Sequence, residues 1–565
     1  MRISKKSMAN IAALACLMSS SAVFAAPGDG STQMPPDKIS GDGGIQMNRM
    51  RNYLERERVN RQIAEDRAAH KAKVEEEKNK AERQETAVSF ELKKIVIDKS
   101  SVLSEAELDA ITTPYEGRKV TLQDVYTVVD KINALYTKKG YVNCRAFLPP
   151  QTVTEGTIKL LLVEGRTDEY DVSGNSYTKS SYIMKRLHLR KGEIANVRQL
   201  NKDMLLFNAT NSTQLRVVMK PGSTQGTTSY EITAYEPKRD TWTVFEDNAG
   251  SDTSGEYRTG IFFNTKSLSG SCDPLSIGTV LSEGTKAANV TYGHSLGRSG
   301  TKLNLLYSTN AVKTIDGGYK DMVKGHANSF GLGLVQPLVV SETTRTELSL
   351  DYSYQNSKSD FTIGSTRLNI VDDTVQDVGL GFAMTNYGNS SILYQKHSYV
   401  RGYSKSTPET RSADSQHFGF YKFNSLYQKQ YASGQSVNLR ADAQWSGTDG
   451  MVSSRQYYIG GMYSVRGYKE NYLGGDSGFV FSAEYQVPVI ARTTNAFTFF
   501  DYGHVYSNGA SNNVDNILSS VGLGLRSNIG KNCSASLTLG VPLRRDFQAE
   551  TVSKTRLHFM VSGQF

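Results

Sequence analysis

Residues 436–444, with the sequence SVNLRADAQ, carry the pattern that decides the fold. Apolar and polar side chains alternate along this segment, and successive side chains of a β-strand point to opposite faces. One face holds Val437, Leu439, Ala441 and Ala443, and the other holds Asn438, Arg440, Asp442 and Gln444. A strand with one apolar face and one charged face fits a barrel that has lipid outside and water inside.

The same alternation recurs to the end of the chain, at 478–487, 534–543 and 557–565. From residue 238 onward we predict a barrel of sixteen antiparallel strands, each about ten residues long, and no long helix. Short turns alternate with longer loops, which we place at 312–326, 357–368, 404–415 and 447–476. This arrangement is typical of an outer-membrane β-barrel with periplasmic turns and external loops. A soluble β-sandwich is the alternative, and the strand length and the charges on the inner face disfavour it.

The composition agrees with a barrel and excludes one other class of membrane protein. The chain has 565 residues, of which 38% are hydrophobic and 21% charged, with 49 glycines and 31 tyrosines. A polytopic helical membrane protein would need many apolar runs of about 20 residues. The net charge of +9 is spread over the chain, so we expect no nucleic-acid partner.

The N-terminal region divides into a predicted signal peptide and a charged segment. Residues 1–26 combine Lys5 and Lys6 with a short apolar run and a cleavage point near Ala25, which predicts secretion. Residues 27–87 are expected to hold a flexible stretch, a helix and a linker, the helix covering 46–85 because Arg, Lys, Glu and Ala dominate there. Its apolar stripe is thin, so this helix is solvated, bridging, or packed in a polar place.

Residues 88–237 are predicted to form two small α+β domains, 88–166 and 167–237. In the first, Ser104 and Glu107 have the spacing of a capping box, and a helix over 121–139 ends at Gly140. The second repeats a similar plan, with helices near 180–187 and 197–208 and strands near 214–220 and 229–235.

Several motifs resemble one known family, the two-partner secretion transporters (TpsB proteins) of the POTRA-barrel superfamily. Near the end of the first α+β domain the markers are GYV at 140–142, RAFLPPQ at 145–151 and LVEGR at 162–166. In the barrel they are Val465-Arg466-Gly467-Tyr468, inside the longest loop, and Phe499, Asp501 and Gly503, spaced as FxDxG two strands later. Late in the second domain, Thr228 stands where the family usually has Ser.

The resemblance implies two POTRA domains, a barrel and an N-terminal plug helix, for which we expect residues 45–64. It also places Phe499, Asp501 and Gly503 on the inner barrel wall. An unpaired guanidinium in a partly dry lumen is costly, so we expect Arg466 to pair with Asp501, and Gly503 to leave room for the loop. The alternative is that Arg466 is one more solvated loop arginine.

The function implied by the resemblance is export of a large, β-helical partner protein from the periplasm to the cell surface. The partner is an adhesin, a haemolysin or a contact-dependent toxin, and the POTRA domains would bind it by adding strands to sheet edges. We find no P-loop motif, so we expect no nucleotide hydrolysis. Other expected partners are outer-membrane lipid and, because the chain ends at Phe565, the barrel-assembly machinery; we expect a monomer.

The sequence leaves two alternative functions to compare with export. An assembly factor that inserts other proteins into the outer membrane is disfavoured by only two POTRA copies and by a plug helix. An enzyme or a passive porin is disfavoured because no HExxH motif is present and a porin needs no POTRA domain. We expect no catalytic residue, cofactor or metal site, and Cys144, Cys272 and Cys533 are too few and too scattered for a disulfide framework.

Overall fold

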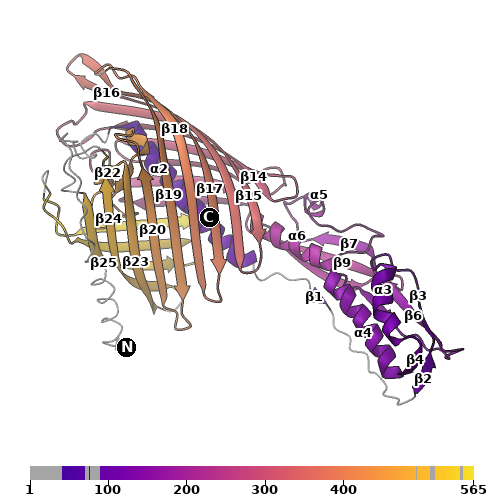
Figure 1. The fold of residues 1–565 in the computed structure, drawn as a ribbon. Helices are drawn as coiled ribbons and strands as arrows, with labels where there is room; N and C mark the ends of the chain where they lie inside the picture. The colour runs from indigo at the N-terminus through magenta and orange to yellow at the C-terminus, as the bar shows by residue number, and fades with distance from the viewer. Residues whose placement is uncertain are drawn as a thin grey trace.

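The computed structural model describes residues 41–69, 75–76, 89–410, 412–490, 493–508, 516–547 and 551–565. Three parts follow one another in the chain: helix α2 (Gly43–Ala69), two α+β domains, and a closed β-barrel. In Figure 1, α2 runs inside the barrel and the two α+β domains project away from one end. The predicted signal peptide, 1–26, lies outside the described residues.

Within the described residues, sixteen antiparallel strands close into one barrel, which confirms the predicted fold class. The first eight are β10 (Asp240–Asp247), β11 (Arg258–Thr265), β12 (Leu275–Leu281), β13 (Thr285–Leu296), β14 (Thr301–Lys313), β15 (Val323–Val340), β16 (Thr344–Ile363) and β17 (Thr366–Tyr387). The last eight are β18 (Ser391–Ser406), β19 (Asp414–Gln430), β20 (Ser436–Ser446), β23 (Ser477–Ile490), β24 (Thr494–Tyr506), β25 (Ile517–Ile529), β26 (Cys533–Pro542) and β27 (Arg556–Gln564). The pairing of β10 with β27 closes the ring.

The outer face of the last barrel strands carries exposed apolar side chains. Leu523 on β25 is 62% exposed, and Leu557 and Val561 on β27 are 49% and 48% exposed. Leucines and valines left open to this extent on one face of each strand are suited to a lipid environment. Among the described residues, no helix is long and apolar enough to cross a membrane.

One of the predicted external loops, 357–368, is wrong, because the strands continue through it. β16 and β17 form one ladder up to the pair Ile363 and Thr366, so the predicted loop 357–368 is a hairpin with a tight turn. Residues 355–360 of β16, QNSKSD, are polar on both faces and lack the alternation that identified the strands elsewhere. The predicted loops 312–326 and 404–415 are present with narrower bounds: β14 ends at Lys313 and β15 starts at Val323, and β18 ends at Ser406 and β19 starts at Asp414.

The first α+β domain packs two helices against small sheets. Its elements are β2 (Ser89–Leu92), β3 (Lys94–Ile97), α3 (Glu105–Thr112), the 3-10 turn η2 (Thr113–Tyr115), β4 (Arg118–Thr121), α4 (Leu122–Lys139), β5 (Cys144–Phe147) and β6 (Thr157–Glu164). The capping box of Ser104 and Glu107 forms as predicted, and Gly140 ends α4 in the left-handed conformation with φ 94°. Burial raises the pKa of the Cys144 thiol to about 12, so this cysteine is an inert part of the core.

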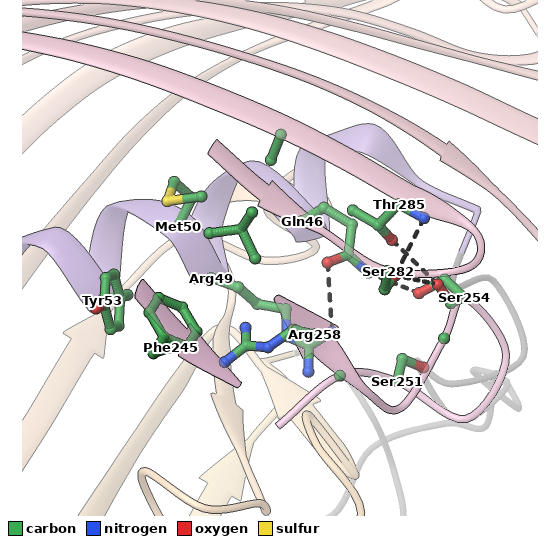
Figure 2. A pocket seen from close by; sticks show the side chains of 14 residues that line it. Gln46, Arg49, Met50, Tyr53, Phe245, Ser251, Ser254, Arg258, Ser282 and Thr285 are labelled. Atoms are coloured by element: carbon green, nitrogen blue, oxygen red, sulfur yellow. Dashed lines mark hydrogen bonds between the residues drawn. The ribbon is translucent and has the colours of Figure 1, made fainter. Parts of the chain in front are cut away.

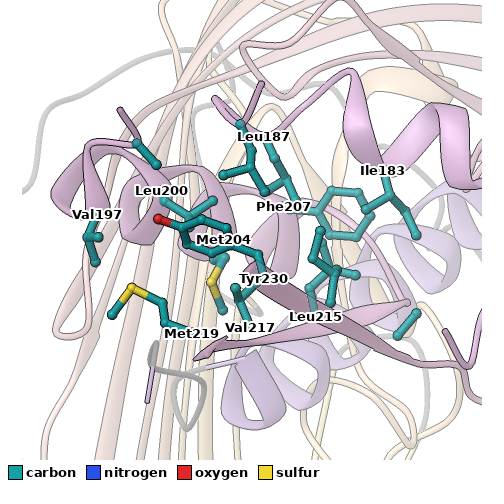
Figure 3. Packing of buried hydrophobic residues seen from close by; sticks show 14 of the residues in the cluster. Ile183, Leu187, Val197, Leu200, Met204, Phe207, Leu215, Val217, Met219 and Tyr230 are labelled. Carbon is teal, nitrogen blue, oxygen red and sulfur yellow. The ribbon is translucent and has the colours of Figure 1, made fainter. Parts of the chain in front are cut away.

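The second α+β domain has a similar plan and its own apolar core. Its elements are β7 (Arg166–Ser173), α5 (Ser180–Met184), α6 (Val197–Thr210), β8 (Gln214–Pro221) and β9 (Thr227–Tyr235). Figure 3 shows Leu200, Met204 and Phe207 of α6 packed over Val217 and Tyr230 of the sheet. Cys272, from the turn between β11 and β12, is buried in the same core, so the barrel is joined to this domain by apolar packing.

The two α+β domains share one arrangement of hydrogen bonds between an asparagine side chain and a strand, which supports an internal duplication. In the first, Asn133 of α4 donates to the carbonyl of Ala146 at 3.1 Å and accepts from its N–H at 2.7 Å. In the second, Asn208 of α6 makes the same two contacts with Leu215, at 3.0 and 2.7 Å. In each domain an asparagine amide satisfies both backbone groups of one residue at the sheet edge.

The boundary between the two α+β domains is bridged by one asparagine. Asn196 is the N-cap of α6, and its Oδ1 accepts from the N–H of Gln199 at 3.1 Å. Its Nδ2 donates to the carbonyl of Lys139, at the C-terminal end of α4, at 3.0 Å. One side chain therefore caps two helices in different domains.

At the other end of α6, Arg345 of β16 donates to the carbonyl of Ala209, which ties the helix to the barrel.

Helix α2 is shorter than predicted. It begins at Gly43 and ends at Ala69, whereas the sequence predicted a helix as far as residue 85. Glu75–Glu76 instead forms a short strand, β1, that pairs in parallel with Val218 and Met219 of β8. Helical propensity alone is a weak guide here, because pairing with a sheet edge overrides it.

We expect Asn196→Ala to loosen the junction between the two α+β domains. Loss of an N-cap costs about 0.5–2 kcal/mol, and this change also leaves the carbonyl of Lys139 without its donor. Limited proteolysis of the full chain should cut the α+β region faster than in the wild type. Lys202→Ala, an exposed position on the same helix, is the matched control; equal cleavage of the two variants would contradict the bridging role.

Candidate functional site

The loop between β20 and β23 folds back into the barrel and carries the predicted motif. It contains the turn η3 (Ser453–Arg455) and a two-stranded ribbon of β21 (Tyr457–Ile459) and β22 (Leu473–Gly475). Val465 and Tyr468 are fully buried in an apolar cluster with Ile459 of the ribbon and Val480 and Val505 of the wall. This packing fixes the loop tip against the inner face of β23 and β24.

Arg466, at the tip of this loop, is bound to the wall by several charged contacts. Its Nε donates to Oδ2 of Asp501 at 2.8 Å, its Nη2 donates to Oδ1 at 2.9 Å, and its backbone N–H donates to Oδ2 at 3.0 Å. Its Nη1 donates to Glu484 at 2.9 Å. The guanidinium also lies 3.6 Å from the centre of the Phe499 ring. Asp501 is 0% exposed, and such a carboxylate needs this compensation because an isolated buried charge is costly.

The two glycines of the motifs allow the loop and the wall to come close. At Gly503, an added Cβ would lie 2.8 Å from Cγ2 of Val465, so a side chain there would displace the loop. Gly467 has φ 97°, and an added Cβ would lie 3.2 Å from the backbone of Gly540. Its N–H donates to Nε2 of His558 at 3.1 Å. The predicted residues therefore lie together at one contact between the loop and the wall.

Sequence reasoning missed two members of this site, Glu484 and Arg526. Glu484 accepts from Arg466 on one side and from Arg526 of β25 on the other, which extends the network across three neighbouring strands. The polar alternation of 478–487 places Glu484 on the inner face, but nothing in one sequence indicates that it lies opposite Phe499 in the register.

A second buried arginine, Arg455, fastens the base of the same loop. It is 1% exposed, and its Nε donates to Asp377 of β17 at 2.7 Å. Its Nη1 donates to Gln355 at 2.8 Å and its Nη2 to Ser353 at 3.0 Å, both on β16. Arg466 and Arg455 thus hold the loop to opposite parts of the wall.

Helix α2 lies in the lumen and contacts both this loop and the wall. Arg49 pairs with Glu470 of the loop at 3.6 Å, and Lys396 of β18 donates to Glu55 at 2.8 Å. The helix also makes apolar contacts at two places: Met50, Tyr53 and Leu54 pack against β10 to β12, and Val59 and Ile63 pack against β18. Figure 2 shows the first of these places, where Gln46, Arg49 and Met50 point toward β10 to β12. The polar helix predicted from the sequence therefore lies in the lumen of the barrel, where charged side chains of the wall and the loop contact it.

The part of the chain that the structure describes contains no group of three His, Cys, Asp or Glu side chains arranged to hold a metal. Cys144, Cys272 and Cys533 are all free thiols. The predicted motif residues are charged, aromatic and small, and their contacts position a loop.

A closed outer-membrane barrel with an inward loop and preceding α+β domains defines the POTRA-barrel class of proteins. Within this class, the chain belongs to the haemolysin secretion/activation protein family ShlB/FhaC/HecB, whose family model matches residues 226–527. Residues 90–165 match the ShlB-type POTRA domain. It is a two-partner secretion transporter of the outer membrane, with its POTRA domains in the periplasm.

Relatives with this architecture are similar along most of their length. The heme/hemopexin transporter protein HuxB of Haemophilus influenzae is 23% identical over 487 residues, which cover 81% of this chain and 84% of HuxB. The outer membrane transporter CdiB of Escherichia coli strain 536 is 24% identical over 482 residues, covering 80% and 79% of the two chains. The solved structure of CdiB from Escherichia coli matches with a TM-score of 0.70 at 19% identity, covering 95% of this chain and all of that one. CdiB from Acinetobacter baumannii matches with a TM-score of 0.65 at 16% identity, over 93% of this chain and 99% of that one.

The two arginines that share Glu484 allow a matched test of the buried network. Arg466→Met leaves Asp501 buried without its main partner, which costs about 3–5 kcal/mol for a buried pair broken on one side. Arg526→Met removes a side chain that is 42% exposed, so its loss costs far less. In SDS gels, a folded barrel migrates differently from the heat-unfolded protein. We expect the temperature of the shift from the folded to the unfolded band to fall clearly in Arg466→Met and little in Arg526→Met. An equal fall in both variants would contradict the assignment of Arg466 as the central contact.

Proposed function

We propose that this transporter exports one large, β-rich partner protein from the periplasm to the cell surface, and that helix α2 closes the resting pore. The observation that carries the proposal is the position of α2. A helix with charge on nearly all sides occupies the lumen, where wall and loop side chains of opposite charge meet it. A lumen of this kind is polar and wide enough for such a helix.

The partner is a secreted adhesin, haemolysin or contact-dependent toxin. In this proposal the two POTRA domains, 88–166 and 167–237, bind its unfolded chain, and the chain passes through the barrel, 238–565. Folding of the partner outside makes its return unfavourable, so transport needs no nucleotide. The transporter acts as a monomer, and the barrel-assembly machinery inserts it into the membrane.

The loop motif Val465-Arg466-Gly467-Tyr468 and the wall motif of Phe499, Asp501 and Gly503 keep the long loop on the inner wall during transport. Arg466 makes two short contacts with Asp501, at 2.8 and 2.9 Å, whereas Arg49 of α2 lies 3.6 Å from Glu470, which supports different roles for the two elements. The loop would remain while the helix leaves.

Deleting this protein should abolish surface display of its partner alone. The measurement is surface proteolysis of whole cells together with the levels of unrelated outer-membrane proteins. If those unrelated proteins fall as well, the chain acts as an assembly factor instead.

The Arg466→Ala variant should reach the membrane in normal amount and secrete much less partner; normal secretion would contradict a role for the motif.

Deleting residues 43–69 should raise the single-channel conductance several-fold in planar bilayers, because the lumen then contains water in place of the helix. Deletion of residues 27–40 is the control and should leave conductance as in the wild type. Unchanged conductance without the helix would contradict its role as a plug.

A further inference from the structure

A space remains between α2 and the barrel wall on the side of β18 to β20. Its volume is about 210 Å³, and its charged lining includes Arg51, Glu55, Arg56, Lys422, Arg440 and Asp442. One water molecule needs roughly 10–15 Å³ on this measure, so the space has room for a hydrated small ion. It lies on the opposite side of α2 from the pocket in Figure 2 that Arg49, Met50 and Tyr53 line together with β10 to β12.

The carboxylates of this space are already engaged. Asp442 accepts from Arg440 at 2.7 Å and lies 3.9 Å from Arg56. Glu55 accepts from Lys396 at 2.8 Å. Glu57 and Tyr53 also line the space, and Glu57 has a contact of its own.

Among the described residues that line this space, Arg51 on the helix and Lys422 on the wall are the cations for which no close ion pair is found. Asp377 and Glu55 attract Arg51 from farther away, and Arg455 repels it. The nearest described contact of Arg51 is a 3.5 Å hydrogen bond to Asn48, and that of Lys422 is the Phe420 ring, 5.6 Å from Nζ. Lys422 lies within electrostatic reach of three cations, Arg51, Lys396 and Arg455, and of the carboxylate of Glu55.

Like charges confined in a partly dry lumen repel, and an anion between them would offset the repulsion. A guanidinium offers two parallel N–H donors, and an ammonium offers a compact point charge. Together they match a small tetrahedral oxyanion, whose oxygens accept from both.

We propose that Arg51 of α2 and Lys422 of β19 bind one small inorganic oxyanion, such as phosphate, between the helix and the wall. Because one ligand group is on the helix and the other on the barrel, the anion binds the plugged state and not the open one. It therefore stabilises the plugged state, a consequence that rests on the proposed role of α2. At an anion concentration ten times its dissociation constant, the ratio of closed to open pores rises about 11-fold.

The first test uses the full chain in planar bilayers, with potassium phosphate titrated into potassium chloride at constant ionic strength and pH. The wild type should close increasingly, up to about tenfold, while Lys422→Gln and Arg51→Gln do not respond. Lys429→Gln is the matched control, since it lies on the same strand at an outward, odd-numbered position and should respond like the wild type. Phosphate responses that are equal in wild type and Lys422→Gln, or a response that added chloride reproduces, would overturn the proposal.

The second test measures binding without any pore. Titration calorimetry of the detergent-solubilised protein should show one phosphate bound by the wild type and by Lys429→Gln, and none by Lys422→Gln or Arg51→Gln. Binding that does not change closure would support the site and contradict the plug. If the wild-type pore closes but calorimetry shows no bound phosphate, the anion site is wrong and the role of α2 as a plug is unaffected. Normal heat-modifiability of each variant shows that its barrel is folded.

Discussion

A backbone that crosses lipid must pair every N–H and C=O group within itself, and this constraint determines the rest of the structure. The ladder from β10 to β27 meets it by closing on itself, so that no edge strand faces the hydrocarbon. Sixteen strands give a ring too wide for side chains from the wall alone to fill. Closure therefore creates a wet lumen, and the contents of that lumen determine what the protein can do.

The lumen is occupied by two elements with different kinds of contact. The loop tip combines an apolar cluster around Val465 and Tyr468 with the charges of Arg466, Asp501 and Glu484. Water is excluded there, so each charged hydrogen bond is strong and the loss of one partner is costly. Gly503 and Gly467 are part of the same arrangement, since a side chain at either position would separate the loop from the wall.

Much of this could be predicted from the sequence, and the failures have physical reasons. The two-residue period identified the barrel because lipid and water select opposite faces, and the period is lost where β16 and β17 leave the lipid. The motif residues identified the contact of Arg466 with Asp501. Arg526 could not be added, because its contact with Glu484 depends on the register of three strands. Asn196 and Asn133 were missed for a similar reason: each links elements that are far apart in the chain or in different domains.

The contacts of α2 differ from those of the loop in strength, and this difference bears on transport. Arg49 and Arg56 of α2 approach their carboxylates at 3.6 and 3.9 Å, while Lys396 of the wall donates to Glu55 at 2.8 Å. Longer, single ion pairs contribute less than the short bidentate pair of Arg466 with Asp501, whose loss costs about 3–5 kcal/mol. A helix held by several weak polar contacts can be bound in the resting state and still be displaced by an incoming chain. A helix with an apolar stripe would bind more tightly and would expose that stripe when it left; the polar sequence of α2 avoids both consequences.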